Sequence, residues 1–371
     1  MDIEDYKERS PQVITVKNGW IRAFVGDDIP QIADALGFRS EDGEVAYAAV
    51  RRHTGARTVD AMLLDIPEWL GEGTEVFTTG QEAHIPAPSP GTTDIEELRF
   101  SAGPSGDAIP FRLRKPSFSA VLGELPALET GFSALDRLAP FCKGGLNLVL
   151  DALDGPAAFD RLCARVGEAI GEGTRTSLWL AGDGRSAEWA SYNIAGGESA
   201  QRQLAALRIL MSWAIWLRDA GDNVLLAAEL PPLTSHGAVS EAEMAMGVSI
   251  GDVIDQLGTT LTSTEAGTIT TVLRLPLYRS ASGIEHIIET MDIGDLDAQV
   301  FVDDQGSFDP YRSTSNADLD AAARADQQRV LSVLSRAAAA RDKSAMLGEF
   351  GIDDREKEAL EQAEGLAESL I

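Results

Sequence analysis

The sequence predicts a multidomain protein in which a small N-terminal β-barrel precedes a central α/β domain with a parallel sheet and a C-terminal α-helical domain. Short strand-like runs separated by glycines fill residues 13–79. From Leu146 onwards apolar strands alternate with helical segments, and beyond Asn316 alanine, glutamate and arginine dominate at helical spacing. We expect the barrel at 1–84, the central domain with its linker at 85–315 and the helical domain at 316–371.

The N-terminal region carries β-branched and alternating runs, namely VITV, WIRAFV, EVAYAAVRRH, TVDAMLLD and TEVFTT. Breaks at Asn18-Gly19, Gly43, Gly55 and Gly71–Gly73 separate these runs. Short strands at this density favour a closed barrel, because closure removes exposed strand edges. Residues 1–12 are polar and charged, and we expect them to form a frayed leader.

The central region begins with a segment, 85–128, whose proline and glycine content is typical of a connector with one short helix at Asp94–Leu98. Continuous apolar strands each followed by a helix then predict a parallel sheet covered on both faces. The expected strands are LNLVL, SLWLA, NVLLAA, TITTVLRL and AQVFV, and the expected helices are Ala157–Ile170, Ala200–Asp219 and a helix around Ile250–Leu257.

The C-terminal region predicts two helices separated by a break at Gly348–Gly351. The second helix is acidic and begins at Asp353; it is either a solvated face or a contact surface. The first helix is expected to bury a mostly apolar stripe, formed by Leu319, Ala323, Gln327, Val330, Leu334 and Ala337.

The charge balance of the 371-residue chain limits its partners. With 59 acidic and 31 basic residues the net charge is −28, which argues against nucleic acid and against an anionic membrane surface, because both need clustered Lys and Arg. No apolar run approaches the roughly 20 residues of a membrane span, so no membrane insertion is expected. Without a signal peptide, and with only Cys142 and Cys163, a cytoplasmic location is expected.

The cysteines and histidines do not predict a metal site. The histidines at 53, 84, 236 and 286 share no ligand spacing with one another or with the cysteines. We interpret Cys142 and Cys163 as small apolar packing residues.

The strand Leu146–Leu150 leads into a loop and a helix, the arrangement that holds phosphates in many nucleotide-hydrolysing proteins. Such loops read G-x-x-x-x-G-K-[ST], whereas Ala157 and Ala158 occupy the lysine and hydroxyl positions here. Carboxylates in the loop would also oppose a triphosphate, so we expect a degenerate loop and no cofactor. The remnant consists of Asp151, Asp154, Gly155 and Pro156, and we interpret Gly155 and Gly144-Gly145 as turn glycines.

The segment ETGFSALDRLAPFCKGG at Glu129–Gly145 resembles the lead-in to the phosphate loop of the catalytic beta subunit of rotary ATP synthases, and APFCKGG is the beta rather than the alpha spelling. The resemblance spans nearly the whole chain. It implies a six-stranded crown barrel, a nucleotide-domain core and a truncated helical domain. Its further landmarks are VFTTGQEAHIPAP, LAGDG, LRDAGDNVLLAAE, LTSTEAGTIT, GDLDA, DPYRSTSN and AMLGEFGIDDREKEALEQ.

The positions that the resemblance assigns to catalysis have changed. The water-orienting glutamate matches Arg185, and the cation that follows it matches Ser186. The aspartate near magnesium matches Glu229, which is still acidic but precedes Pro231-Pro232. Because an unpaired charge at a strand end is costly, we expect Arg185 and Glu229 to pair.

The adenine-binding side has also diverged. An aromatic residue of the family matches Gln305, or Phe308 in a shifted alignment, and a second aromatic falls near Ser369. The family further has a strand between LAGxG and the long helix, where this chain has only Ala187–Gln201. Because parallel strands need a crossover of about a dozen residues, we expect that strand to be absent.

These changes predict a non-catalytic, beta-like assembly or scaffold protein. It would partner itself in a ring or filament, a related ATP synthase-like subunit, or another protein. The alternative is a regulatory subunit that senses nucleotide within an ATP synthase-like ring, and the least favoured hypothesis is a divergent ATP hydrolase.

Overall fold

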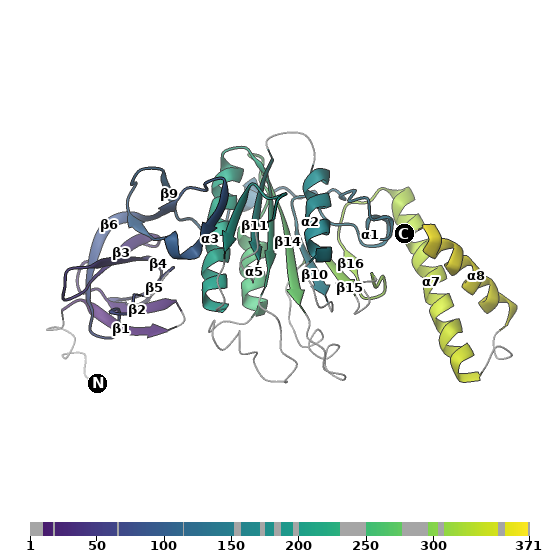
Figure 1. Ribbon diagram of the computed structural model, residues 1–371, viewed down its shortest axis with the longest axis horizontal. Helices are drawn as coiled ribbons and strands as arrows, with labels where there is room; N and C mark the ends of the chain where they lie inside the picture. The colour runs from purple at the N-terminus through teal and green to yellow at the C-terminus, as the bar shows by residue number, and fades with distance from the viewer. Residues whose placement is uncertain are drawn as a thin grey trace.

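The structure is a computed structural model that describes residues 10–17, 19–64, 67–113, 115–151, 157–170, 175–181, 187–195, 200–230, 250–276, 296–302, 308–347 and 353–369. An antiparallel sheet, a parallel-rich sheet and a pair of helices follow one another along the longest axis (Figure 1). This arrangement confirms the predicted multidomain combination of β and α/β structure at the level of its elements.

The N-terminal sheet closes into a ring. Its six strands pair in the order β1-β2-β5-β4-β3-β6, and β6 returns to β1 where Glu75 lies opposite Gln12. The ring encloses its own apolar cluster, in which Ile21, Leu36 and Phe38 are fully buried. The strands are β1 (Gln12–Lys17), β2 (Trp20–Phe24), β3 (Asp34–Arg39), β4 (Val45–Gly55), β5 (Thr58–Met62) and β6 (Glu75–Pro86).

The second sheet has the order β16-β15-β10-β14-β13-β11-β12-β7, and every pair in it is parallel except β15 with β16. Parallel strands need long connections, and helices supply several of them. The strands are β7 (Gly91–Asp94), β10 (Leu146–Asp151), β11 (Arg175–Ala181), β12 (Tyr192–Ala195), β13 (Asn223–Glu229), β14 (Thr268–Pro276), β15 (Ala298–Val302) and β16 (Thr314–Ser315).

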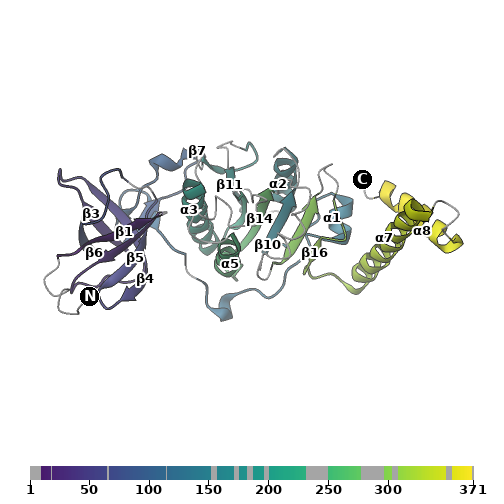
Figure 2. The same ribbon diagram turned by 90° about the horizontal axis from the view of Figure 1, so that it is seen from below.

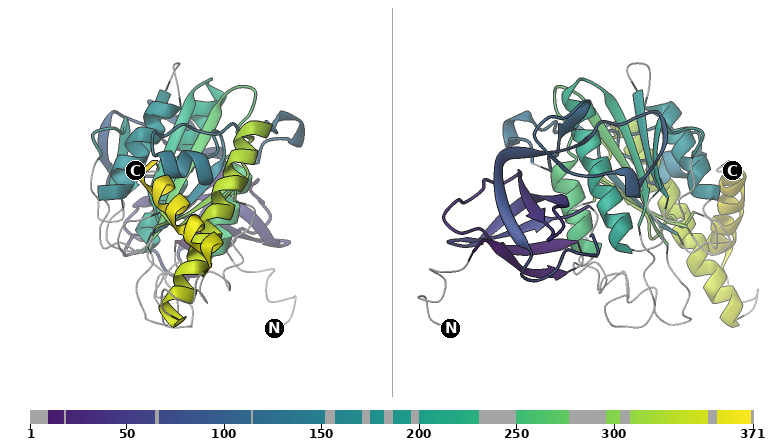
Figure 3. Two further views of the ribbon diagram at one scale, coloured as in Figure 1. Left: turned by 90° about the vertical axis from the view of Figure 1, so that its right-hand side faces the viewer. Right: turned by 60° about the vertical axis from the view of Figure 1, so that its left-hand side comes forward.

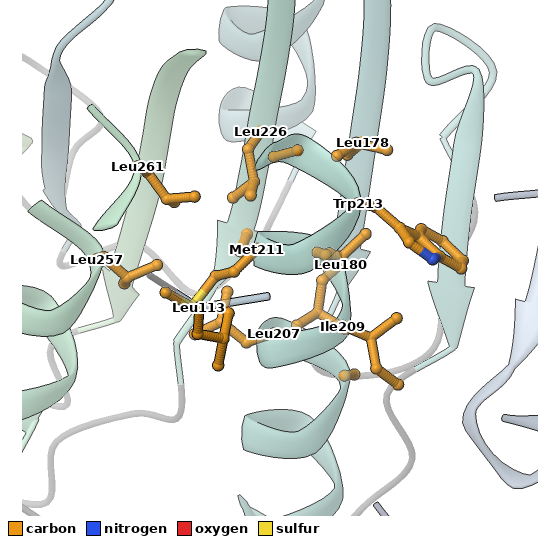
Figure 4. Close-up of a cluster of buried hydrophobic side chains, with 14 of the residues drawn as sticks. Leu113, Leu178, Leu180, Leu207, Ile209, Met211, Trp213, Leu226, Leu257 and Leu261 are labelled. Carbon is orange, nitrogen blue, oxygen red and sulfur yellow. The ribbon is translucent and has the colours of Figure 1, made fainter. Parts of the chain in front are cut away.

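Helices cover both faces of this sheet, as the continuous apolar strands predict. Successive residues of one strand join different clusters: Leu178 and Leu180 pack with α3 (Ala200–Asp219) and α5 (Ile250–Thr260), whereas Trp179 packs with α2 (Ala157–Ala169). Figure 4 shows side chains of α3 between those of β11, β13 and α5.

The ring and the second sheet share a core through α3. Ring residues such as Met62 and Ile85 belong to the same apolar cluster as α3 and the sheet. Polar contacts cross the junction too, because the Trp213 Nε1–H group donates to the Pro86 carbonyl at 2.9 Å and the Arg208 guanidinium lies 5.1 Å from the centre of the Trp20 ring. The ring is therefore packed onto the rest of the protein and is not merely tethered to it.

The predicted absence of a strand before α3 is wrong. β12 (Tyr192–Ala195) lies parallel to β11 on one side and to β7 on the other. β12 is only 4 residues long, and a turn precedes it in which the Ala190 N–H group donates to the Ala187 carbonyl at 3.1 Å. The Asn193 side chain accepts a hydrogen bond from the Ala187 N–H group at 2.8 Å, which fixes that turn.

The connector is also more ordered than its composition predicts. It contributes β7 to the second sheet, and β8 (Ser101–Ala102) and β9 (Ala108–Pro110) pair with β6. The short helix expected at Asp94–Leu98 is a single 3₁₀ turn, η2 (Ile95–Glu97), and a second turn, η3 (Phe118–Ala120), follows.

The C-terminal helices α7 (Ala321–Leu347) and α8 (Asp354–Ser369) pack against each other at the end of the molecule opposite the ring (Figure 3). Val330 and Ala337 are buried as predicted, but Ala323 is exposed; Val333 and Ala337 of α7 pack with Ala363 of α8. Where α7 meets α1 (Ser133–Leu138), the Arg137 Nη2 group donates to Asp326 at 3.0 Å. Among the helices in the described part of the chain, none has the length and apolar character to cross a membrane.

Candidate functional site

The candidate site lies at the carboxyl edge of the second sheet, where open α/β sheets generally bind ligands. Asp151 ends β10 there and lies opposite Pro276 of β14 and Val302 of β15. Glu229 ends β13, and its register partner on β14 is Arg274. The strand order β10-β14-β13 therefore brings both acidic strand ends to one edge.

Glu229 and Arg274 form a buried ion pair across β13 and β14. The Arg274 Nη1 group donates to Glu229 Oε1 at 2.7 Å, and the two residues are only 5% and 7% exposed, respectively. The backbone continues the pairing, since the Leu230 N–H group donates to the Arg274 carbonyl at 2.8 Å. A charge buried this deeply is tolerated when an opposite charge and hydrogen bonds balance it, and each residue provides that balance for the other.

The pair faces α2. Leu225, Ala227 and Val272 belong to the cluster that contains the α2 side chains, and strand alternation places Glu229 and Arg274 on the same side. Cys163 of α2 is close enough to Glu229 for its pKa to be affected. Burial raises the pKa of the Cys163 thiol well above the ordinary value, and the Asp160 and Glu229 carboxylates raise it further. Cys163 is thus a neutral packing residue at physiological pH, as we predict from sequence.

The ion pair changes what Glu229 can do. A magnesium ligand must offer a carboxylate oxygen to the metal, but a guanidinium already holds an oxygen of this carboxylate in a buried setting. Within the described residues, no three His, Cys, Asp or Glu side chains gather in a way that could hold a metal ion.

The expected Arg185–Glu229 pair has only one of its members in the described residues, because Arg185 lies outside them, as does Ser186. The structure instead assigns Arg274 as a partner of Glu229. The sequence contains a signal for this residue that we missed, since Arg274 is a lone charge within the apolar run TITTVLRLP. A charge inside a buried strand needs a partner on a neighbouring strand.

The remaining predicted site positions fall in several places. Ala157 and Ala158 begin α2, so the positions that the sequence pattern matches to the lysine and the hydroxyl lie at the amino end of that helix. Phe308 forms an isolated bridge with Val302 and packs against the α2-side cluster, whereas Ser369 ends α8. Asp154, Gly155, Pro156 and Gln305 lie outside the described residues.

The turn before β10 supports the interpretation of Gly144-Gly145. Gly144 has a φ of +78°, a conformation that glycine adopts without strain, and its N–H group donates to Thr270 Oγ1 at 2.9 Å. Cys142 begins this turn in a fully buried position, and burial raises the pKa of its thiol to about 12. The turn is a folded entrance to β10 and carries no reactive thiolate.

Compared with models of known protein families, the sequence matches none.

Proposed function

We propose that the chain is a non-catalytic protein, related to the beta subunit of rotary ATP synthases, that acts through its surfaces as an assembly or scaffold protein. The observation that carries the proposal is the buried Glu229–Arg274 pair. It places a fixed protein cation on the one acidic residue that persists among the positions matched to the family's catalytic groups. The charge of Glu229 is thereby balanced by a cation of the protein itself.

Loss of turnover follows from the electrostatics of phosphoryl transfer. Most of the rate acceleration comes from positioned charges on the phosphates and on the attacking water. Ala157, Ala158 and Arg185 stand where a lysine, a hydroxyl and a carboxylate are required. Each such loss costs orders of magnitude in rate, and none of the three replacements supplies the missing group.

The assembly role is supported by a contrast between two regions. The loop after β10 departs from the sequence of phosphate-binding loops, whereas the N-terminal strands still pair into a closed ring. The ring keeps continuous antiparallel pairing and its own buried cluster. The loop before β3 also carries two large apolar side chains at the surface, Ile29 at 50% and Ile32 at 40% exposure. Apolar groups on a rigid ring suit contact with another copy, and the rotation between copies decides between a closed ring and an open filament.

Charge opposes this assembly and makes it depend on salt. Copies with a net charge of −28 repel one another, and salt screens that repulsion with a Debye length of about 10 Å at 0.1 M. We therefore expect association to strengthen as ionic strength rises from low to physiological values.

Light scattering after size exclusion tests the proposal. At tens of micromolar protein and physiological salt we expect a mass well above 39.6 kDa, and the variant Ile29→Glu/Ile32→Glu should return it to the monomer. Phe118→Glu is the matched control, because Phe118 is an exposed apolar residue outside the ring at 97% exposure. A strict monomer at both salt concentrations would overturn self-assembly.

A further inference from the structure

The connector between the ring and α1 crosses the amino edge of the second sheet, far along the strands from the Glu229–Arg274 pair. Figure 2 shows it leaving the ring, passing outside the sheet and reaching the α1 side. Two backbone contacts hold it in place: Leu122 N–H donates to the Ser263 carbonyl at 3.1 Å, and Val121 forms an isolated bridge with Thr264.

A pocket of about 370 Å³ lies beside this crossing, between the connector, the end of α3 and the loop before β14. Pro116 and Ala120 of the connector and Ile215 of α3 supply its apolar walls. Such a volume accommodates a small organic molecule rather than an ion alone.

Cations outnumber carboxylates in the lining of this pocket. Arg112, Lys115 and Arg218 line it together with Asp219 and Glu265, whereas the whole chain has 31 basic and 59 acidic residues. The lining therefore carries a local excess of positive groups, although the net charge of the whole chain is negative. Arg112 also forms an ion pair with Glu82, which lies outside the pocket lining, at an Nε–Oε1 distance of 3.4 Å.

Arg218 is the most buried of these cations, with a side chain that is 4% exposed. Its guanidinium donates to Asp219 Oδ1 at 2.9 and 2.7 Å and to the Thr262 carbonyl at 2.8 Å. An arginine has five N–H donors, so three bonds leave donor capacity for a further acceptor. Its position is set by these bonds before any ligand arrives.

Thr264 provides a further polar group in the lining. It lines the pocket at 7% exposure, and its hydroxyl oxygen has no hydrogen-bond partner within the described residues. A buried hydroxyl without a partner is destabilising, so such groups mark places where a ligand or water completes the bonding.

We propose that this pocket binds a small organic anion, with a carboxylate or phosphate-ester group held by Lys115 and Arg218 and an apolar body against Pro116, Ala120 and Ile215. The site is separate from the carboxyl edge and does not depend on the proposed function. Asp219 and Glu265 limit the affinity for an anion, and Asp219 is already paired with Arg218.

Thermal melting and calorimetry at constant ionic strength test the site with five probes: phenyl phosphate, benzoate, inorganic phosphate, neutral phenol and benzylamine. Phenyl phosphate or benzoate should raise the melting temperature and bind with a saturable isotherm, and the stronger of the two identifies the anionic group. Phenol and inorganic phosphate should each bind at least tenfold more weakly, because phenol lacks the anionic group and inorganic phosphate lacks the apolar body.

Variants separate the pocket from general charge effects. Lys115→Met should weaken the better probe at least fivefold, whereas Lys143→Met, outside the lining, should not change it. Thr264→Val should weaken it while the matched Thr271→Val, which removes another unpartnered hydroxyl outside the lining, should not. Absence of saturable binding by both organic anions, equal binding of benzylamine, or an unchanged affinity in Lys115→Met would overturn the proposal.

Discussion

Buried polar groups find their partners in different ways at the two edges of the second sheet. At the amino edge, neutral side chains bond to the backbone: Asn147 bonds to Cys142 and Gly145, and the Ser263 hydroxyl donates to the Gly144 carbonyl at 2.8 Å. At the carboxyl edge two full charges, Glu229 and Arg274, neutralise each other. The hydrogen bonds around Asn147 hold the turn that leads into β10, whereas at the carboxyl edge the charges of Glu229 and Arg274 neutralise each other.

The largest effect should come from breaking the amino edge at Asn147, which is fully buried. Its Oδ1 accepts from the Cys142 N–H group at 2.7 Å, and its Nδ2 donates to three carbonyls at 3.1–3.2 Å. Asn147→Leu leaves the Cys142 N–H group without its acceptor and removes the side-chain bonds to three carbonyls, which together should lower the free energy of unfolding by about 4–5 kcal/mol. Urea unfolding measures this loss.

The matched control is Asn316→Leu, since Asn316 is exposed and its Nδ2 donates to the Leu296 carbonyl at 3.0 Å. We expect this variant to lose no more than about 1 kcal/mol. Equal losses at the two positions would contradict the distinction between a buried network and a surface hydrogen bond.

The ion pair at the carboxyl edge should give the next largest effect. Arg274→Met leaves Glu229 buried without this cation, and the expected loss is about 3–4 kcal/mol. The double variant Arg274→Met/Glu229→Leu removes both charges and should recover most of that loss. Chemical unfolding of the two single variants and the double variant completes the cycle, and additive losses would show that the two residues do not act as a pair.

Asp60 in the ring offers a milder version of the same arrangement. Burial of its carboxyl acts to raise its pKa, but hydrogen bonds and charge from Arg22 and Arg52 outweigh burial and leave the pKa below its usual value. The arginine side chains are 47% and 68% exposed, so solvent screens this cluster more than the Glu229–Arg274 pair. Asp60→Asn should therefore cost about 2 kcal/mol at pH 7.

The sign of the pH dependence follows from the lowered pKa. The carboxylate stabilises the fold fully above the unfolded value of about 3.9 and loses that contribution as pH falls through the lower folded value. The stability gap between the wild type and Asp60→Asn should thus be constant from pH 6 to 7 and shrink below about pH 4. A gap that widens in acid would contradict this assignment.

Local sequence patterns predict the elements of this sheet well. The helix expected at Ala200–Asp219 has those bounds in the structure, because its apolar residues and the flanking glycine set its ends. The contacts at the edges of the sheet were harder to predict. Arg274 pairs with Glu229 because the two residues are in register on neighbouring strands, and no local sequence pattern shows that register. β12 and β7 were missed because runs of 4 residues are too short to show a periodic pattern, and they become strands through pairing, β7 with β12 and β12 also with β11.

The site residues also differ in whether local sequence predicts them. The Ala157 and Ala158 substitutions can be read directly from the loop, whereas the pocket at the amino edge joins residues from the connector, α3 and the β14 loop that are distant in sequence. For the ring, removal of residues 1–90 would be a poor test of assembly, because Met62 and Ile85 belong to the core that α3 completes. Point changes at the ring surface avoid that damage.

Calorimetric titration of the full chain with ATP and magnesium tests most directly whether the protein's own cation has replaced the ligand at the carboxyl edge. We predict no binding heat that fits a dissociation constant below about 100 μM, which corresponds to roughly −5.5 kcal/mol. A tighter constant that is lost in Glu229→Gln would show that Glu229 still serves a bound nucleotide, and it would contradict the account.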